Sequence, residues 1–479
     1  MFKKSSIFFL IGVLYVFLTM YFVWTDQAYL SLASIGLIAI FAAVYYTEYT
    51  FLAIAFFTPL SINIEEYTKS FGLFLPTEPL LFGMMLLLLL MQIKKNLFPV
   101  EIWKNPLIWA VIFYVFWIFI TMITSSSPLV SAKFLLARLW FMVPLLLYGP
   151  VVFKKETNIR LFMWLYVIGM MIAIAYTVTI HAMYAFGEKE GHWVMFPFFK
   201  DHTIYGCMVA FTVPMVFGLY FSKKHTPLIQ AVLLSFIVLN IVGLYFSYTR
   251  AAWLSVFAAV GVWILIHFRV KFSILAGITA FVAVSIFFSW DAIQISMSKN
   301  HSEHTTEDFG KKLESATNVT TDASNLERLN RWSCAISMFQ ERPFFGYGPG
   351  TYANEYARFQ RPENLTIIST SNGDGGNAHS EFLGPMAEMG FLGLIAMLLI
   401  TAAIFYKGIT LYLQWPIEEK ELRTLILAMI LALVTYFIHA FLNNFLDTDK
   451  AAVPIWGFCA AFIALEIRLK KAKTLISNE

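Results

Sequence analysis

Long apolar runs separated by short polar segments follow one another along most of this 479-residue chain. A helix needs about 20 mostly apolar residues to cross a bilayer, so each long run predicts a membrane-spanning helix. The pattern predicts an all-α polytopic membrane protein with about 12–14 transmembrane helices. The expected spans, with boundaries accurate to about 2–4 residues, are 7–24, 28–46, 49–61, 78–93, 106–124, 134–152, 161–185, 203–221, 227–246, 251–268, 273–289, 381–405, 424–442 and 451–467.

One hydrophilic segment, about 291–378, interrupts this pattern and is long enough to form a separate domain. Its first part is polar and charged, which is typical of disordered segments. Its second part predicts a short helix, because apolar residues recur at spacings of three and four from Leu329 to Phe339. The sequence thus predicts an N-terminal bundle of about 11 helices at 1–290, a large loop at 291–378, and about three helices with a tail at 379–479.

The composition supports a protein whose surface mostly faces lipid. Charged residues make up 13% and hydrophobic residues 59% of the chain, whereas a soluble domain has about 25% charged residues. A soluble enzyme is therefore excluded. The three cysteines, Cys207, Cys334 and Cys459, show neither a disulfide framework nor metal-type spacing.

The lysines and arginines indicate how the chain is oriented. If the N-terminus lies inside, every short loop on the same side is basic, as expected for cytoplasmic loops. Both termini are then cytoplasmic and 291–378 is periplasmic, with Lys450 in a short outer loop. The N-terminal apolar run lacks a small-x-small cleavage site and reads as an uncleaved first helix. The net charge of +4 is explained by orientation, and we expect no nucleic-acid partner.

Three segments on the outer side carry candidate chemistry. The first, 247–253, contains Arg250 at the mouth of two helices. This arginine either snorkels to the interface or clamps phosphate, since a guanidinium presents a rigid fork of donors. The second, 328–350, contains Arg328 and Arg331, one helical turn apart, which form either a solvated face or part of the same clamp.

The third segment, 379–394, begins where the large loop re-enters the membrane. His379 at this edge is either a hydrogen-bonded structural residue or a general base, because its unperturbed pKa is about 6.5. The segment also contains Glu381. The pair Gly384-Pro385 predicts a kink in the re-entering helix within two turns of His379.

These segments, in this order, resemble the O-antigen ligase and polymerase superfamily. The matching patterns are Thr-Arg-Ala-Ala-Trp, then Arg-x-x-x-Trp with Pro-x-x-Gly-x-Gly-Pro-Gly, then His-Ser-x-Phe-Leu with Glu-x-Gly-x-x-Gly-Leu. The resemblance implies a GT-C-like membrane enzyme of lipopolysaccharide biosynthesis in the bacterial inner membrane. It also implies that Arg250 and Arg328 bind the diphosphate of an undecaprenyl-diphosphate-linked glycan, with Arg331 as the alternative to Arg328. His379 then activates the acceptor hydroxyl.

The chemistry of the residues agrees with that role. A diphosphate is already a good leaving group, so cationic groups and one base suffice for an inverting displacement, and we expect no metal and no cofactor. Further residues expected to line the cavity are Arg138, Lys200, Asp201, His202 and Glu381. A metal site at His301, His304 and Glu307 is less favoured than a solvated loop.

Several functions remain open on the sequence alone. The favoured one is a ligase that transfers the glycan to lipid A–core or to protein. A polymerase that transfers it to a growing glycan shares the same motifs. The other class is a transporter or flippase of lipid-linked sugars, which would place charges near the midplane on broken helices.

Overall fold

The computed structural model describes residues 4–25, 31–65, 72–270, 285, 323–360 and 376–477. Within these ranges the chain is mostly helical. The two described strands, β1 (Ile62–Asn63) and β2 (Phe74–Leu75), pair as a short antiparallel hairpin. Ten of the described helices are long and apolar enough to cross a membrane. The prediction of an all-α polytopic membrane protein is therefore confirmed.

The helices follow the predicted spans closely. In chain order they are α1 (Lys4–Trp24), α2 (Ser31–Tyr45), α3 (Thr47–Phe57), η2 (Thr58–Leu60), α5 (Thr77–Lys94), η3 (Val100–Lys104), α6 (Pro106–Ile123), α7 (Pro128–Met142), η4 (Val143–Tyr148), α8 (Gly149–Val152), α9 (Glu156–Met183), η5 (Glu190–His192), α10 (His202–Ser222), α11 (Pro227–Tyr245), α12 (Arg250–His267), α16 (Ala323–Glu341), α17 (Tyr352–Glu355), η6 (Tyr356–Phe359), α18 (Leu383–Gln414), α19 (Lys420–Ala440) and α20 (Asp449–Ser477).

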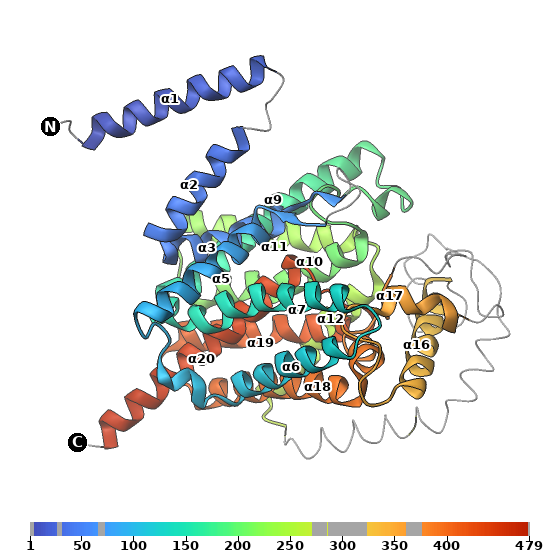
Figure 1. Ribbon diagram of the computed structural model, residues 1–479. Coiled ribbons are helices and arrows are strands. Elements are labelled where there is room, and N and C mark those ends of the chain that lie inside the picture. The colour runs from blue at the N-terminus through green and yellow to red at the C-terminus, as the bar shows by residue number, and fades with distance from the viewer. Residues whose placement is uncertain are drawn as a thin grey trace.

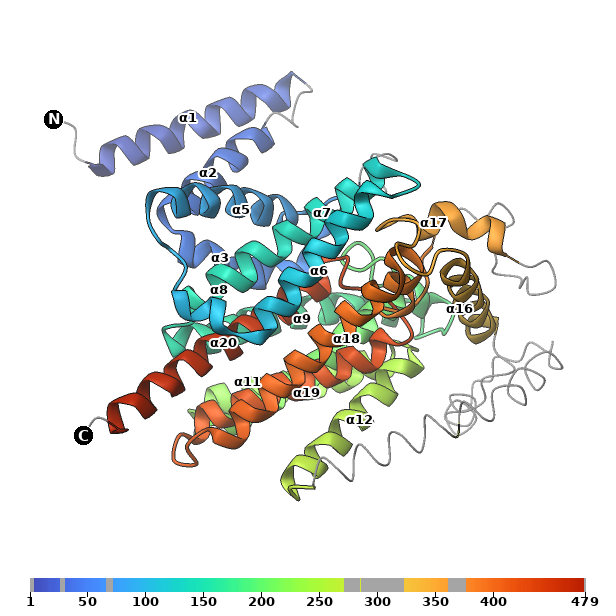
Figure 2. The ribbon, with the colours of Figure 1, turned by 60° about the horizontal axis from the view of Figure 1, so that its bottom comes forward.

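Apart from α1, which lies outside the bundle at the upper left, the long apolar helices run side by side, and α16 and the short helix α17 lie at one end of the bundle (Figure 1). Both termini of the chain lie toward the opposite end, on the left in Figures 1 and 2. The bundle has its centre at α10, α19 and α20, which bury most of their residues. Close packing there needs small residues: a Cβ at Gly218 of α10 would lie 2.3 Å from the Cβ of Ala428 of α19.

Local sequence signals set where several helices begin. Asn105 accepts a hydrogen bond from the Leu107 amide and precedes a proline at the first helical position of α6. Thr226 and Pro227 start α11 in the same way. A side-chain cap satisfies an amide that has no partner within the helix, and proline has no amide to satisfy. These starts are therefore determined by a few adjacent residues.

The predicted kink beside His379 is placed wrongly. Pro385 lies in the first turn of α18, where its missing amide costs no hydrogen bond. The break occurs at Gly390, whose φ of 67° and ψ of −163° are not helical. At this position a Cβ would lie 2.2 Å from the Phe344 carbonyl oxygen. Glycine is required there because another segment of backbone approaches closely.

Lys450 also differs from its predicted place in a short outer loop. It lies in the first turn of α20 and is 1% exposed. Its Nζ donates to the carbonyl oxygens of Thr58 (2.8 Å) and Ser61 (2.7 Å), beyond the end of α3. A buried charge must be paired or hydrogen-bonded, and Asp449 beside it is hydrogen-bonded to Ser61 as well. The pattern of apolar residues alone could not reveal this tertiary contact.

Several predictions fall on residues that are not described. They are most of the span at 273–289, the polar part of the large loop up to residue 322, and the alternative metal ligands His301, His304 and Glu307. They stay predictions. The division of the chain at 290 and 378 is likewise untested.

Candidate active site

The second and third motifs meet at the end of the bundle that carries α16. The Trp332 Nε1 donates to the carbonyl oxygen of His379 at 3.3 Å. The Arg331 Nη1 donates to the carbonyl oxygen of Asn377 at 3.2 Å. The Asn377 side chain in turn accepts from the His379 amide at 3.0 Å. One face of α16 therefore holds the turn that presents His379.

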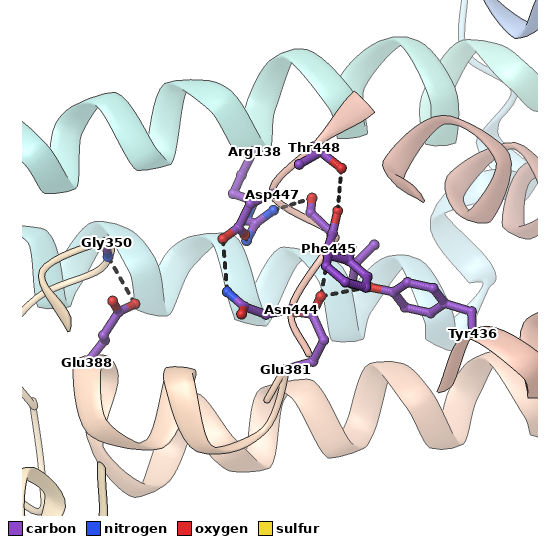
Figure 3. Close-up of polar contacts among 10 residues, drawn as sticks. Arg138, Gly350, Glu381, Glu388, Tyr436, Asn444, Phe445, Asp447 and Thr448 are labelled. Atoms are coloured by element: carbon purple, nitrogen blue, oxygen red, sulfur yellow. Dashed lines mark hydrogen bonds and ion pairs between the residues drawn. The ribbon is translucent and has the colours of Figure 1, made fainter. Parts of the chain in front are cut away.

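The glycine-rich turn of the second motif is joined to Glu388 of the third. The carboxylate of Glu388 accepts from the amide of Gly350 at 2.9 Å (Figure 3). It also accepts from the amide of Tyr352 at 2.9 Å. Gly348 donates its amide to the Glu388 carbonyl at 2.7 Å. At Gly346, with φ of 62°, a Cβ would lie 2.3 Å from the Glu388 carbonyl carbon. These residues form one structural unit that places α16 against α18.

His379 itself adopts a left-handed backbone conformation, with φ of 47°. This region is uncommon for a residue other than glycine, and such outliers are enriched at functional sites. The conformation is held on both sides, by Asn377 at the amide and by Trp332 at the carbonyl. The backbone of His379 is thus held in this conformation from both sides.

The surroundings keep His379 neutral. Burial lowers its pKa to about 4, and the positive charges of Arg331 and Arg328 add to this effect. Burial is the larger of these causes. A neutral imidazole at pH 7 has a lone pair available to accept a proton.

The two arginines of α16 are in different environments. Arg331 is 7% exposed and is held by the Glu327 carboxylate, with 2.8 Å between its Nε and Oε1. Its guanidinium also lies over the Tyr356 ring, 5.0 Å from the centroid. Arg328 is less buried. Its charge acts on His379, His202 and His439, which come from three different segments.

The first motif is tied to the start of α10. The Thr249 hydroxyl donates to the carbonyl oxygen of His202 at 2.8 Å. A Cβ at Gly206 would lie 2.7 Å from that of Thr249, so the two segments touch closely. Arg250 directly follows as the first residue of α12 and is partly exposed. Because His202 is in the field of Arg328, the turn that carries Arg250 lies beside the same region.

The three residues predicted at the start of α10 have separate places. Asp201 caps the helix by accepting from the amides of Thr203 and Ile204, and its charge also reaches His379. The ring of His202 packs on that of His192 at 4.3 Å between centroids. Lys200 is exposed. The structure therefore brings Asp201 and His202 toward the site, and leaves Lys200 at the surface.

Arg138 and Glu381 hold the loop between α19 and α20 against the His379 turn (Figure 3). Arg138 is 6% exposed, forms an ion pair with Asp447 and donates to the Leu446 carbonyl oxygen. The Oε1 of Glu381 accepts from the Leu446 amide at 2.8 Å and from the Tyr436 hydroxyl at 2.6 Å. Burial and the nearby Asp447 charge raise the pKa of Glu381 to about 7. Both residues were predicted to line a cavity, and both are buried in contacts with protein.

Sequence reasoning missed His439 and Asp447. His439 lies within the apolar span of α19 and is fully buried. Its Nδ1 is 3.4 Å from the side-chain nitrogen Nδ2 of Asn443. An ionisable residue inside a membrane span is a functional candidate by default, so the signal was present in the sequence. In the part of the chain that the structure describes, there is no group of three or more potential metal ligands.

The fold and this site define a multi-pass α-helical membrane protein that gathers a histidine, arginines and buried carboxylates at one end of its bundle. Residues 235–398 match the family model Wzy_C, described as O-antigen ligase. The match includes all three motif segments and confirms the resemblance to the O-antigen ligase superfamily. This family match suggests a membrane enzyme of the O-antigen ligase or polymerase type. A comparison with curated proteins found no match.

The buried contacts of Glu381 predict how its variants will behave in glycan transfer. Glu381→Gln keeps an oxygen that accepts from Leu446 and Tyr436, so kcat should stay within a few-fold of wild type. Glu381→Ala removes the acceptor and frees the His379 turn. A misplacement of about 1 Å costs roughly 10²-fold, and kcat should fall by about that factor while KM for the donor stays unchanged.

The measurement is steady-state transfer by purified protein at matched levels. Glu466→Ala is the control, because Glu466 also forms partly buried ion pairs, with Lys407 and Lys470, but lies near the C-terminal end of α20. It should change thermal stability without changing kcat. Equal loss of kcat in Glu381→Gln and Glu381→Ala would show that charge, not the acceptor geometry, is what matters.

Proposed function

We propose that the protein transfers an oligo- or polysaccharide from an undecaprenyl-diphosphate carrier to an acceptor hydroxyl on the periplasmic side of the inner membrane. The observation that carries the proposal is His379, neutral and fixed in a left-handed turn, in the field of Arg328. The family match supports the class of reaction. The acceptor is lipid A–core, protein or a growing glycan.

The reaction is an inverting displacement that needs no metal ion. His379 accepts the proton of the acceptor hydroxyl as its oxygen attacks the anomeric carbon. The bond between that carbon and the diphosphate oxygen breaks, and undecaprenyl diphosphate leaves with the electron pair. Negative charge grows on the leaving diphosphate, so cationic groups placed there lower the barrier.

Arg328 and Arg250 are the proposed diphosphate ligands. The charge of Arg328 acts on His379, His202 and His439. Arg250 is the first residue of α12 and follows Thr249, which is hydrogen-bonded to His202. Arg331 is engaged with Glu327, Asn377 and Tyr356, so its proposed role is to hold the His379 turn and to add positive potential. Arg138 is held by Asp447 and Leu446 in a similar way.

The donor itself makes His379 a stronger base. In the free protein, burial and two arginines hold its pKa near 4, which favours the neutral form but makes proton transfer uphill. A bound diphosphate brings negative charge next to the same arginines. An opposite charge within about 4–6 Å favours the protonated imidazole, so the base becomes competent when the donor is in place.

Ligase and polymerase differ in the acceptor and share this chemistry. A deletion strain separates them: a ligase leaves lipid-linked polymer intact but uncapped on the acceptor, and a polymerase leaves single repeat units. If the protein were a transporter, its deletion would instead abolish delivery of lipid-linked glycan to the outer leaflet. The polar residues described above gather at one end of the bundle, which favours surface chemistry over transport.

Replacing His379 tests the base directly. General-base assistance contributes typically 10²–10⁴-fold, so His379→Ala should lower kcat by at least about 10²-fold with little change in donor binding. The assay is glycan transfer by purified protein with a lipid-diphosphate donor. His379→Asn, which keeps a polar group that tolerates the left-handed region, separates the base from the turn geometry. Near wild-type rates in both variants would contradict the role of His379 as the general base.

The pH dependence of transfer should show the donor's effect on His379. The profile of kcat/KM reports the free enzyme, and that of kcat the donor complex. With a pKa near 4 in the free protein, kcat/KM should stay level from pH 7 down to about 5 and fall only below that. The acid limb of kcat should lie at higher pH, because the bound diphosphate favours the protonated form. Coincident acid limbs would contradict the model of charge compensation.

Arginine-to-lysine changes test the clamp. A lysine keeps the charge but not the bidentate fork, so Arg328→Lys and Arg250→Lys should each raise KM for the donor by about tenfold or more, equivalent to roughly 1.4 kcal/mol. Arg331→Lys should mainly reduce thermal stability, because it disrupts the contacts of α16. If Arg331→Lys raises KM while Arg328→Lys does not, the two roles are exchanged.

A further inference from the structure

A groove runs between α18 and α19, on the surface of the bundle. These helices lie side by side (Figure 2). The groove has a volume of about 350 Å³. Its walls are aromatic and aliphatic, and the lining residues are Phe382, Leu398, Thr401, Ala402, Phe405, Val434, Phe437, Ile438 and Phe441.

The groove offers an occupant almost no hydrogen-bond donors. Its one hydroxyl, that of Thr401, already donates to the Met397 carbonyl oxygen at 2.9 Å. Leu398 and Phe441 are each about half exposed (47% and 54%), so the groove opens to the outside of the protein. In helices that span a membrane, this surface faces hydrocarbon. The groove is therefore suited to an apolar chain.

One end of the groove reaches the candidate active site. Phe382 lies three residues after His379, and its ring packs on Phe441 at 4.7 Å between centroids. The amide of Glu381 donates to the carbonyl oxygen of Ala440 at 2.8 Å, which ties the two walls together. His439 lies on the same turn of α19 as Phe441 but interacts with the charge of Arg328. The groove and the polar site are thus on adjoining faces of the same two segments.

We propose that this groove binds the first isoprene units of the polyprenyl chain of the lipid-diphosphate donor. This inference rests on the proposed function, which puts the diphosphate at Arg328 and His379. The chain must pass from there into the bilayer, and the Phe382–Phe441 end of the groove begins three residues after His379. A cavity of about 150 Å³ holds benzene, so about 350 Å³ has room for roughly two or three five-carbon units.

Shape, not hydrophobicity, has to provide the selectivity. Lipid tails are as apolar as the protein surface, so there is no hydrophobic drive to leave the bilayer for the groove. Binding depends on van der Waals packing, and a methyl-branched, unsaturated chain fills the spaces between phenyl rings differently from a straight acyl chain. Phe405 and Phe437, whose ring centroids are 5.4 Å apart, supply such a surface in the inner part of the groove.

Filling the groove tests the proposal. Ala402→Trp puts a large ring into it without touching the polar site. The ring occupies the space proposed for the chain, so undecaprenyl diphosphate should bind about tenfold more weakly. Binding of methyl diphosphate, which has no chain, should be unchanged. Val260→Trp on α12, another lipid-facing position at 48% exposure, is the matched control and should bind both ligands normally.

The outcomes separate this inference from the function itself. Equal undecaprenyl diphosphate affinity in Ala402→Trp and wild type would overturn the groove assignment, even with transfer intact. Failure of wild type to bind either diphosphate would overturn the proposed function first. A photo-crosslinker at Ile438 gives a second readout: undecaprenyl diphosphate should displace phospholipid there. Crosslinking to phospholipid that excess undecaprenyl diphosphate does not reduce would show an ordinary annular lipid site and would reject the proposal.

Discussion

The backbone hydrogen bonds of Leu446 connect three parts of the chain that are far apart in sequence. Its amide donates to Glu381 in the turn before α18, and its carbonyl oxygen accepts from Arg138 of α7. Asp447 next to it neutralises Arg138. Near a bilayer, water cannot readily replace a lost hydrogen bond, and a buried charge left without its partner is strongly destabilising. The position of the His379 turn therefore depends on this network.

The two arginines of α16 differ in their contacts and in their burial. Arg331 is fixed by Glu327 and Asn377, and it adds positive potential without moving. Arg328, one turn away, is less buried and acts on histidines from three other segments. In the proposed reaction these two environments have different uses, because preorganised groups that stay in place stabilise the charge that develops on the leaving diphosphate.

The family signature combines chemistry and architecture. Gly346, Gly348 and Gly350 take left-handed conformations where α18, the α6–α7 turn and α7, respectively, come close. Glu388 satisfies the amides that this turn exposes. The Gly-Pro turn and the Glu-x-Gly segment are separated in sequence but form one contact in space. These two segments together determine how α16 packs against α18. The proposed transfer reaction depends on His379 and the arginines.

The sequence by itself determined the helical class, most span boundaries and the three motifs, because apolar period, helix caps and charge distribution are local properties. It also identified His379, Arg250 and Arg328 as candidates from residue type and position near the membrane edge. Tertiary structure decided that Arg331 pairs with Glu327, that Lys450 is buried, and that α18 breaks at Gly390 and not at Pro385. Those features depend on partners far away in the chain, such as Glu327, Ser61 and Phe344, and no local pattern specifies which distant groups will meet.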